Sequence, residues 1–301
     1  MNYFDLHCDT IYEMYVKGQD FKENNLAIDG KRRKIFNKHK QVYSVWSNPE
    51  LTDYDNYKRF FEIVNYAKSK EEFPEIAGDI ESQDAIIGIE GAGILENDAY
   101  RLDVLYSHGV RVLTLAWEGE NCLAGAYNTD KGLTAFGKTV CEACAEKGIS
   151  VDVSHLSHKG IYEVIDIAKT VSLPIMASHS CLKELCDTER NLSSEQAKRI
   201  ADLGGVIGIN FVGSHLNSHY ENEGATIDHV RMHIEKAISL AGAESVCIGA
   251  DFDGTEKLPH GINGIEDIEK IYNALKVQTA ERVFYNNAYN YFKRVLGEGR
   301  K

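Results

Sequence analysis

Short apolar runs rich in valine and isoleucine recur along the chain, and amphipathic stretches separate most of them. Strands buried on both faces have this composition, and parallel strands need a crossover that is usually a helix. Eight runs fit the pattern and are predicted strands: Tyr3–His7, Val42–Trp46, Ala85–Glu90, Val110–Trp117, Ile149–His155, Pro174–His179, Val206–Phe211 and Val246–Asp251. No G-x-G-x-x-G follows any run, which argues against a dinucleotide-binding sheet. The pattern therefore predicts an α/β fold, a (β/α)8 TIM-type barrel with a single domain over residues 1–301.

Three of the intervening stretches place apolar residues at helical spacing. These residues are Leu102, Leu105 and Tyr106; Ile161, Val164, Ile165 and Ala168; and Val230, Ile234, Ala237, Ile238 and Ala241. The segment Ser193-Ser194-Glu195-Gln196 is typical of a helix start. A C-x-x-C motif, Cys141 and Cys144, falls in the helical stretch Thr134–Lys147. Since the chain has no second cysteine pair, we predict two buried thiols there and not a zinc or redox site.

The composition is that of a folded protein, with 43% hydrophobic and 26% charged residues among 301. A formal net charge of −13 argues against a nucleic-acid partner, which would require a basic face. No apolar run approaches the roughly 20 residues of a membrane span, and the first residues do not resemble a secretory signal. The seven cysteines, an odd number, then favour reduced thiols and a cytoplasmic location, with no membrane partner.

Polar side chains stand at the ends of most of the predicted strands. The first strand ends in His7-Cys8-Asp9, where residues two apart point to the same side. Four other strands end in Glu90, His155, His179 and Asp251. A barrel enzyme assembles its site at the carboxyl ends of its strands. These six side chains are therefore expected to converge at one mouth of the barrel.

Each of these residues also has a simpler interpretation. A single histidine in an apolar run is usually a core residue, Asp251 could cap a helix, and Glu90 could pair with an arginine. Their coincidence favours a metal site, because burying acids on neighbouring strands without a counter-charge costs several kcal/mol each. Three imidazoles and two carboxylates suit Zn²⁺, and their number suits two ions better than one.

The order of the motifs resembles that of the membrane (renal) dipeptidase family, zinc-dependent peptidases of the amidohydrolase-like superfamily, and in particular its bacterial members. The resemblance covers most of the chain, from residue 4 to about residue 254. The matching segments are FDLHCDT, IGIEGA, GVRVLTLAW, GLTAFGK, GISVDVSHLS, ASHS followed by ERN, GGVIGINF and IGADFDG.

The resemblance implies a binuclear zinc site. His7 and Asp9 would bind one ion, His155 and His179 the other, and Glu90 would bridge the two. A zinc-bridging hydroxide would then attack the scissile carbonyl. Family members often form dimers, so a homodimer is one expected state, and the sequence itself leaves the oligomeric state open.

The resemblance also assigns substrate and proton roles. Asp251 matches the family's acid–base residue, which takes a proton and delivers it to the leaving amine. Arg190 matches the arginine that holds the substrate's C-terminal carboxylate, although a surface ion pair with Asp187 or Glu189 is the simpler interpretation. His215 lies where the family often places a further substrate-contacting residue.

The sequence departs from the family pattern in one motif of the site. Studied members have a histidine after LTLT that contacts the substrate carbonyl, whereas here LTLA precedes Trp117. Indole can donate one hydrogen bond but cannot change charge. Either another residue therefore stabilises the oxyanion, or no side chain does. Asn121, four residues later, is a candidate substitute. The family's signal peptide and lipid-anchor signal are not seen in this sequence.

Three functions follow from these observations. The first is a zinc dipeptidase for short peptides with a free C-terminal carboxylate, tolerating a D-residue at that position as family members do. The second keeps the metals but acts on another substrate, such as an N-acyl amino acid or a lactone, and Trp117 keeps this open. The third is a barrel that binds metal or peptide without turnover, against which the retained Asp251 argues.

Overall fold

Eight parallel strands close into one barrel in the computed structural model, which describes residues 1–76, 80–82 and 84–297. Each strand pairs with the next along the chain, and the first pairs with the last. The strands are β1 Asn2–Cys8, β2 Lys38–Trp46, β3 Ala85–Glu90, β4 Val110–Thr114, β5 Ser150–Asp152, β6 Ile175–Ala177, β7 Val206–Ile209 and β8 Val246–Ile248. The predicted (β/α)8 barrel is confirmed.

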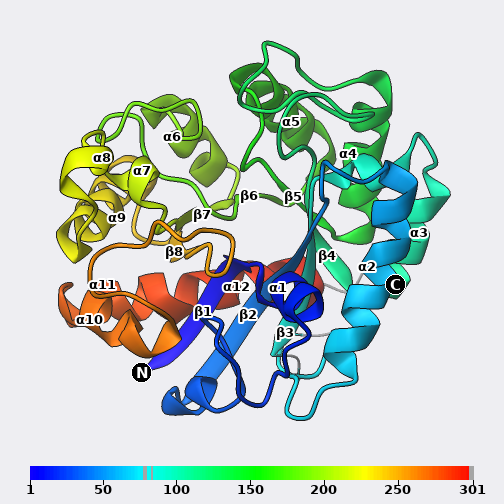
Figure 1. The fold of residues 1–301 in the computed structure, drawn as a ribbon. Coiled ribbons are helices and arrows are strands. Elements are labelled where there is room, and N and C mark those ends of the chain that lie inside the picture. Colours follow the sequence, from blue (N-terminus) through cyan, green and yellow to red (C-terminus); the bar gives the residue numbers. More distant parts are fainter. Residues whose placement is uncertain (77–79, 83, 298–301) are drawn as a thin grey trace.

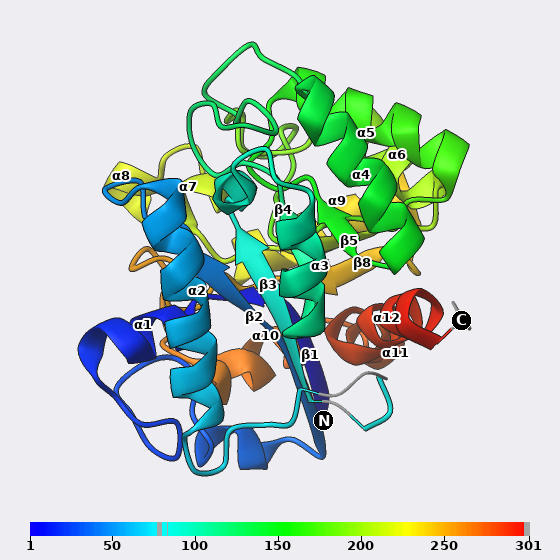
Figure 2. The same ribbon diagram turned by 90° about the vertical axis from the view of Figure 1, so that its right-hand side faces the viewer.

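Helices surround the barrel in Figure 1, and Figure 2 shows α2 to α5 outside β3 to β5. The α-helices are α1 Thr10–Lys17, α2 Asp53–Lys68, α3 Tyr100–Ser107, α4 Ala135–Lys147, α5 His158–Val171, α6 Ser194–Asp202, α7 Gly213–Leu216, α8 Tyr220–Glu223, α9 Ile227–Ala241, α10 Ile268–Asn273, α11 Val277–Glu281 and α12 Asn287–Gly297. Short 3-10 turns lie at Arg32–Ile35, Ala92–Leu95 and Ile265–Asp267, and a π-helical turn at Arg282–Asn286. None of the helices in the described part of the chain has both the length and the apolar character needed to cross a membrane.

The helical patterns of the sequence face the core as predicted. In α5 the residues Ile161, Val164, Ile165 and Ala168 are all buried. Burying an aliphatic side chain such as valine or isoleucine is worth about 1.5–3 kcal/mol, so this face holds the helix on the barrel. The helix start at Ser193 is confirmed by a capping box, in which Ser193 and Gln196 satisfy each other's backbone N–H groups.

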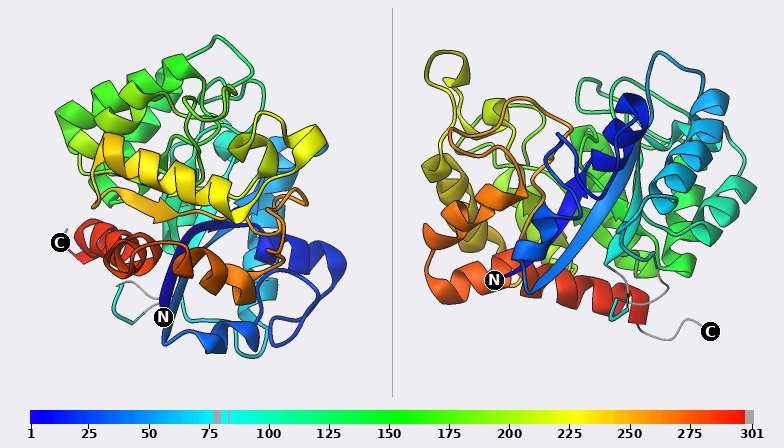
Figure 3. Two further views of the ribbon diagram at one scale, coloured as in Figure 1. Left: turned by 90° about the vertical axis from the view of Figure 1, so that its left-hand side faces the viewer. Right: turned by 60° about the horizontal axis from the view of Figure 1, so that its bottom comes forward.

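The end of the barrel where the strands begin is closed by the C-terminal helix. Figure 3 shows α12 running across this end. Its Tyr291 hydroxyl donates to the Ile175 carbonyl oxygen at 3.1 Å and contacts Ser150 Oγ at 3.0 Å, at the starts of β6 and β5. Phe292 stacks on Phe4 inside the barrel, with ring centroids 5.4 Å apart. The carboxyl ends of the strands therefore form the accessible mouth.

The strands after β3 end two or three residues earlier than the sequence predicted. β5 ends at Asp152 and not at His155, and β8 ends at Ile248 and not at Asp251. One cause is Asp152, whose Oδ1 accepts the backbone N–H groups of Ser154 and Ser178. His155 and Asp251 also have positive φ angles, 68° and 62°, which a pleated strand does not permit. His155, His179 and Asp251 therefore lie on loops just beyond the strands, whereas His7 and Glu90 lie within β1 and β3.

The cysteines carry free thiols. All seven are unpaired, and both Cys141 and Cys144 are buried in α4. Burial raises the pKa of Cys141 to about 12, so this thiol stays protonated at neutral pH. The predicted pair of buried thiols is confirmed.

Candidate active site

A cavity of about 390 Å³ opens at the carboxyl ends of the strands. Most of the side chains singled out in the sequence line it or lie directly beneath it. The lining residues are Asp9, Tyr12, Glu13, Trp46, Glu90, Trp117, Tyr127, His155, Arg190, Val212, His215, Asp251, Asp253, Gly254 and Thr255.

Glu90 stands between two groups of imidazoles. Its Oε1 lies 2.9 Å from His155 Nε2 and 3.4 Å from His179 Nε2. Its Oε2 lies 3.8 Å from Nε2 of His7, on the other side. The carboxylate is buried, and its two oxygens face different histidines. This is the arrangement expected of a carboxylate that bridges two cations.

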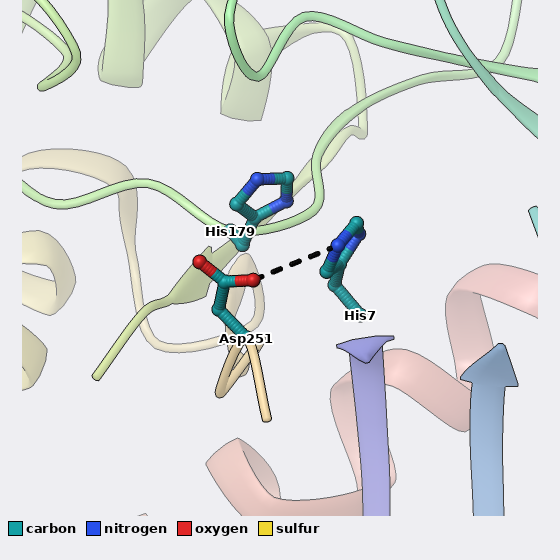
Figure 4. Close-up of side chains that lie close together, drawn as sticks. All are labelled: His7, His179 and Asp251. Atoms are coloured by element: carbon teal, nitrogen blue, oxygen red, sulfur yellow. Dashed lines mark ion pairs between the residues drawn. The ribbon is translucent and has the colours of Figure 1, made fainter. Parts of the chain in front are cut away.

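Two further carboxylates approach His7. Asp9 Oδ2 lies 3.3 Å from His7 Nε2, and Asp251 Oδ1 lies 3.7 Å from the same nitrogen. Figure 4 shows His7, His179 and Asp251 pointing toward one another from three different parts of the barrel. The other oxygen of Asp9, Oδ1, is buried and accepts no hydrogen bond from the described residues. An unsatisfied carboxylate oxygen in such a place fits a metal ligand, because a cation would supply the missing partner.

The outward nitrogens of two histidines are fixed by neighbouring groups. His155 Nδ1 lies 3.1 Å from the backbone carbonyl oxygen of Trp117. A carbonyl only accepts, so this Nδ1 carries the proton and Nε2 presents a lone pair to Glu90 and its surroundings. His7 Nδ1 lies 3.2 Å from Ser44 Oγ on β2, which likewise leaves Nε2 toward the centre.

His179 is oriented through a serine and a buried carboxylate. Ser178 Oγ donates to Asp152 Oδ2 at 2.5 Å, so it accepts from His179 Nδ1–H at 2.7 Å. Asp152 is also held by the Thr114 hydroxyl at 2.7 Å. Outer partners of this kind fix the tautomer of metal-binding histidines and raise their basicity. All three imidazoles thus direct Nε2 to one place.

The electrostatics show how strongly the carboxylates crowd this place. Burial raises the pKa of Asp251 to about 8, and burial together with the nearby Glu90 raises that of Asp9 to about 6. Burial alone would depress the pKa of His7, but Glu90 and Asp9 outweigh it and raise the value to about 10. The protonated imidazole of His7 supplies one positive charge to balance these acids. Divalent ions would serve the same purpose better.

Arg190 is buried without a carboxylate partner among the described residues. It is 8% exposed, and its Nη2 donates only a long bond of 3.4 Å to the His179 carbonyl oxygen. Its guanidinium carbon lies 5.8 Å from the Tyr127 ring centroid. The surface ion pair with Asp187 or Glu189 considered from the sequence is not formed among the described residues: Arg190 is buried, and Glu189 pairs with Lys183 at 3.0 Å. A buried guanidinium facing a cavity is suited to an anionic group of a ligand.

Trp117 forms part of an aromatic wall. Its ring meets Trp46 edge to face, with centroids 5.0 Å apart, and Trp46 meets Tyr12 in the same way at 5.3 Å. All three line the cavity. Trp117 therefore shapes one side of the pocket while its carbonyl orients His155.

Asn121 does not reach the cavity, which corrects the expectation that it could contact substrate. Its Nδ2 donates to the Leu115 carbonyl oxygen at 2.8 Å. Its Oδ1 accepts the backbone N–H groups of Leu123 and Ala124 at 2.8 and 3.0 Å. The side chain thus closes its own loop: its oxygen already accepts two bonds and one of its two Nδ2 hydrogens is engaged.

Several residues of the cavity were not identified from the sequence. Tyr127, Tyr12 and Trp46 have no motif that marks them, since aromatic residues are common in cores and loops. Asp253 could have been found, because it stands two residues after Asp251 in DFDG. Its carboxylate accepts the Thr10 hydroxyl at 2.5 Å and the Ala27 N–H at 2.8 Å, which ties the β8 loop to the β1 side of the mouth.

A second cavity, of about 580 Å³, lies near the opposite end, beside the start of β2. Its lining includes Arg33, Lys40 and Asp84, and both cations pair with Asp84 at 3.1 and 3.2 Å. The groups of three or more possible metal ligands in the described residues all lie at the carboxyl-end mouth: His7, Asp9, Glu90, His155, His179 and Asp251. The candidate metal ligands therefore lie at the carboxyl-end mouth, although the cavity there is smaller than the one beside β2.

Solved structures with this fold include two metallo peptidases. One, described as the dipeptidase AC of family M19, superposes with a TM-score of 0.89 at 20% identity over 99% of both chains. The other, from Rhodobacter sphaeroides, is liganded with a phosphinate mimic of the dipeptide L-Ala-D-Ala. It has a TM-score of 0.87 at 18% identity and covers 98% of this chain and 99% of its own. At such identities the likeness shows a common fold.

Sequence comparison identifies the family. An uncharacterised dipeptidase from Schizosaccharomyces pombe is 33% identical over 207 residues, which are 67% of this chain and 48% of that protein. A second from the same yeast is 31% identical over 231 residues, 75% of this chain and 53% of its own. The chain thus spans about half the length of these curated relatives. The family model of the membrane dipeptidases matches residues 1–291. The chain therefore belongs to the membrane dipeptidase family, peptidase family M19.

Proposed function

We propose that this protein is a binuclear zinc dipeptidase that cleaves short peptides with a free C-terminal carboxylate. The observation that carries the proposal is the position of Glu90, with one oxygen toward His155 and His179 and the other toward His7. Membership of the M19 family supports the same activity.

The donors fit two zinc ions. His7 and Asp9 would hold one ion, His155 and His179 the other, and Glu90 both. Imidazole and carboxylate ligands suit Zn²⁺, and the unpartnered Asp9 Oδ1 supplies a ligand atom that nothing else uses. When bound, two zinc ions supply a water of lowered pKa and a Lewis acid for the scissile carbonyl.

Asp251 is the proposed acid–base residue. Its carboxylate lines the cavity, and its Oδ1 lies 3.7 Å from His7 Nε2, beside the metal ligands. There it can accept a proton from the attacking water and pass it to the leaving amine. The left-handed backbone of Asp251, φ 62°, is a strained conformation of the kind that clusters at active sites.

Arg190 is the proposed anchor of the substrate carboxylate. The guanidinium can grip both carboxylate oxygens, and its burial makes an unpaired charge costly until a substrate arrives. The Rhodobacter relative binds a mimic of L-Ala-D-Ala, and this supports tolerance of a D-residue at the C-terminal position here as well.

Replacing Arg190 by methionine is expected to lower kcat/KM for dipeptides about 30- to 100-fold, mainly through KM. The loss corresponds to charged hydrogen bonds worth about 2–2.7 kcal/mol. The C-terminal amide of the same dipeptide is the matched substrate, since the wild-type enzyme should discriminate against it and the variant should not. Equal losses for the acid and the amide would show that Arg190 does not bind the carboxylate.

The aromatic wall favours one alternative substrate class. Trp117, Trp46 and Tyr12 could accommodate the acyl group of an N-acyl amino acid, which also carries a free carboxylate. Steady-state rates with a dipeptide and with the N-acetyl form of its C-terminal amino acid separate the two. A dipeptidase should prefer the free amine, and preference for the acetylated compound would favour the alternative.

A further inference from the structure

His215 lies at the cavity with one ring nitrogen engaged. It is in α7, the short helix that follows β7, and it lines the same pocket as Arg190 and Asp251. Its Nδ1 lies 3.1 Å from Nδ2 of Asn210. No described residue forms a hydrogen bond with its Nε2. The direction of the Asn210 amide therefore decides which ring nitrogen carries the proton.

The orientation of Asn210 is set by its other contacts. Its Oδ1 accepts the backbone N–H of Val212 at 3.2 Å and faces the Cys181 thiol at 3.3 Å. Its Nδ2 donates to the His179 carbonyl oxygen at 3.3 Å. Exchanging the two ends would place an amide nitrogen against a backbone N–H and an oxygen against a carbonyl. The group that faces His215 is thus the amide donor.

His215 must then accept at Nδ1 and carry its proton on Nε2. Burial, followed by the positive charge of Arg190, lowers the pKa of His215 to about 3, so the ring is neutral at working pH. The result is an uncharged imidazole with one N–H donor on the side of the ring that Asn210 leaves unused.

The same amide connects His215 to residues of the candidate reaction centre. Asn210 Nδ2 and Arg190 Nη2 both donate to the carbonyl oxygen of His179, at 3.3 and 3.4 Å. His179 is a proposed metal ligand, and Arg190 is the proposed anchor of the substrate carboxylate. Asn210 thus joins the His215 ring to the backbone carbonyl of the proposed metal ligand His179, and His215 lines the same pocket as Arg190 and Asp251.

We propose that His215 donates its Nε2–H to the carbonyl oxygen of the scissile bond, and that Asn210 is a positioning residue that holds the required tautomer. The assignment rests on the proposed dipeptidase activity. A neutral donor suits this role, because its hydrogen bond strengthens as negative charge develops on the oxygen in the transition state.

The His215→Leu variant is expected to lower kcat about 100-fold with KM changed less than about threefold, as for loss of one oxyanion donor. Binding of a phosphinate dipeptide analogue should weaken by a similar factor, while bound zinc stays as in the wild type. His215→Gln, which keeps an N–H donor, should recover part of kcat. His219→Leu, at an exposed histidine nearby, is the matched control and should behave as the wild type.

The tautomer gives a readout that does not depend on activity. Long-range ¹⁵N–¹H spectra of histidine-labelled protein, assigned with His215→Gln, should show Nε2 protonated and Nδ1 unprotonated. In Asn210→Leu the preference should weaken and kcat should fall about tenfold, because removing one positioning hydrogen bond costs about that factor. A proton on Nδ1 in the wild type would overturn the assignment.

The outcomes separate this assignment from the proposed function. If the wild type hydrolyses no dipeptide, the dipeptidase proposal fails and this role fails with it. If the wild type is active and His215→Leu is equally active, only the role of His215 is overturned. A loss confined to KM, and absent for the C-terminal amide, would place His215 on the carboxylate and also overturn the carbonyl contact.

Discussion

Replacing Glu90 by glutamine is expected to release most of the zinc and to abolish measurable turnover. The variant keeps the shape of the side chain but removes the charge that three imidazoles share. Breaking a buried ionic arrangement on one side costs about 3–5 kcal/mol, so zinc affinity should fall by roughly 10²- to 10⁴-fold. Metal analysis after dialysis against a weak chelator measures this directly.

Glu13 offers a matched control for this substitution. It lines the same cavity, but its carboxylate pairs with Lys17 at 2.7 Å and with no imidazole among the described residues. Glu13→Gln should therefore keep the wild-type zinc content. Wild-type zinc in Glu90→Gln, measured side by side with this control, would remove Glu90 from the metal site.

Asp251→Asn is expected to lower kcat about 10³- to 10⁴-fold while leaving zinc bound. The asparagine can still accept a hydrogen bond, but it cannot take up and return a proton. Activity of the wild type should fall on the acidic side as Asp251 becomes protonated. Burial raises its pKa to about 8, and bound cations would lower it. The residual activity of the variant should no longer fall in this way as the pH is lowered.

Asp253→Asn provides the comparison within the same DFDG segment. Asp253 accepts hydrogen bonds from Thr10 and Ala27 and faces no imidazole, so its loss should reduce stability more than kcat. A kcat for Asp251→Asn within threefold of the wild type would contradict the acid–base role. Loss of zinc in that variant would instead make Asp251 a ligand, which its 3.7 Å approach to His7 also allows.

Much of the barrel could be predicted because its periodicities are regular. β3 has the predicted bounds Ala85–Glu90, and α5 buries each residue of its predicted apolar face. The strand ends were less predictable. The pattern of alternation does not show that Asp152 takes backbone N–H groups away from the ladder, or that His155 adopts a positive φ.

The candidate ligands were predictable for a topological reason. Parallel strands in a barrel all end at one mouth, so polar residues after several strands must meet there wherever they stand in the chain. Side chains carried by the long loops follow no such rule. No sequence pattern indicates that Tyr127 lines the cavity. Likewise, none indicates that the Asn121 side chain forms its hydrogen bonds within its own loop. Hydrogen bonds between loop atoms decide such positions, and no periodicity reports them.

The most direct test of the account combines metal analysis with a dipeptide panel on one preparation. The wild type should contain about two zinc ions per chain and hydrolyse L-L and L-D dipeptides. Removal of the metal should abolish hydrolysis, and added zinc should restore it. Two zinc ions per chain with no hydrolysis of any L-L, L-D or D-D dipeptide would contradict the assignment of this site as a dipeptidase centre.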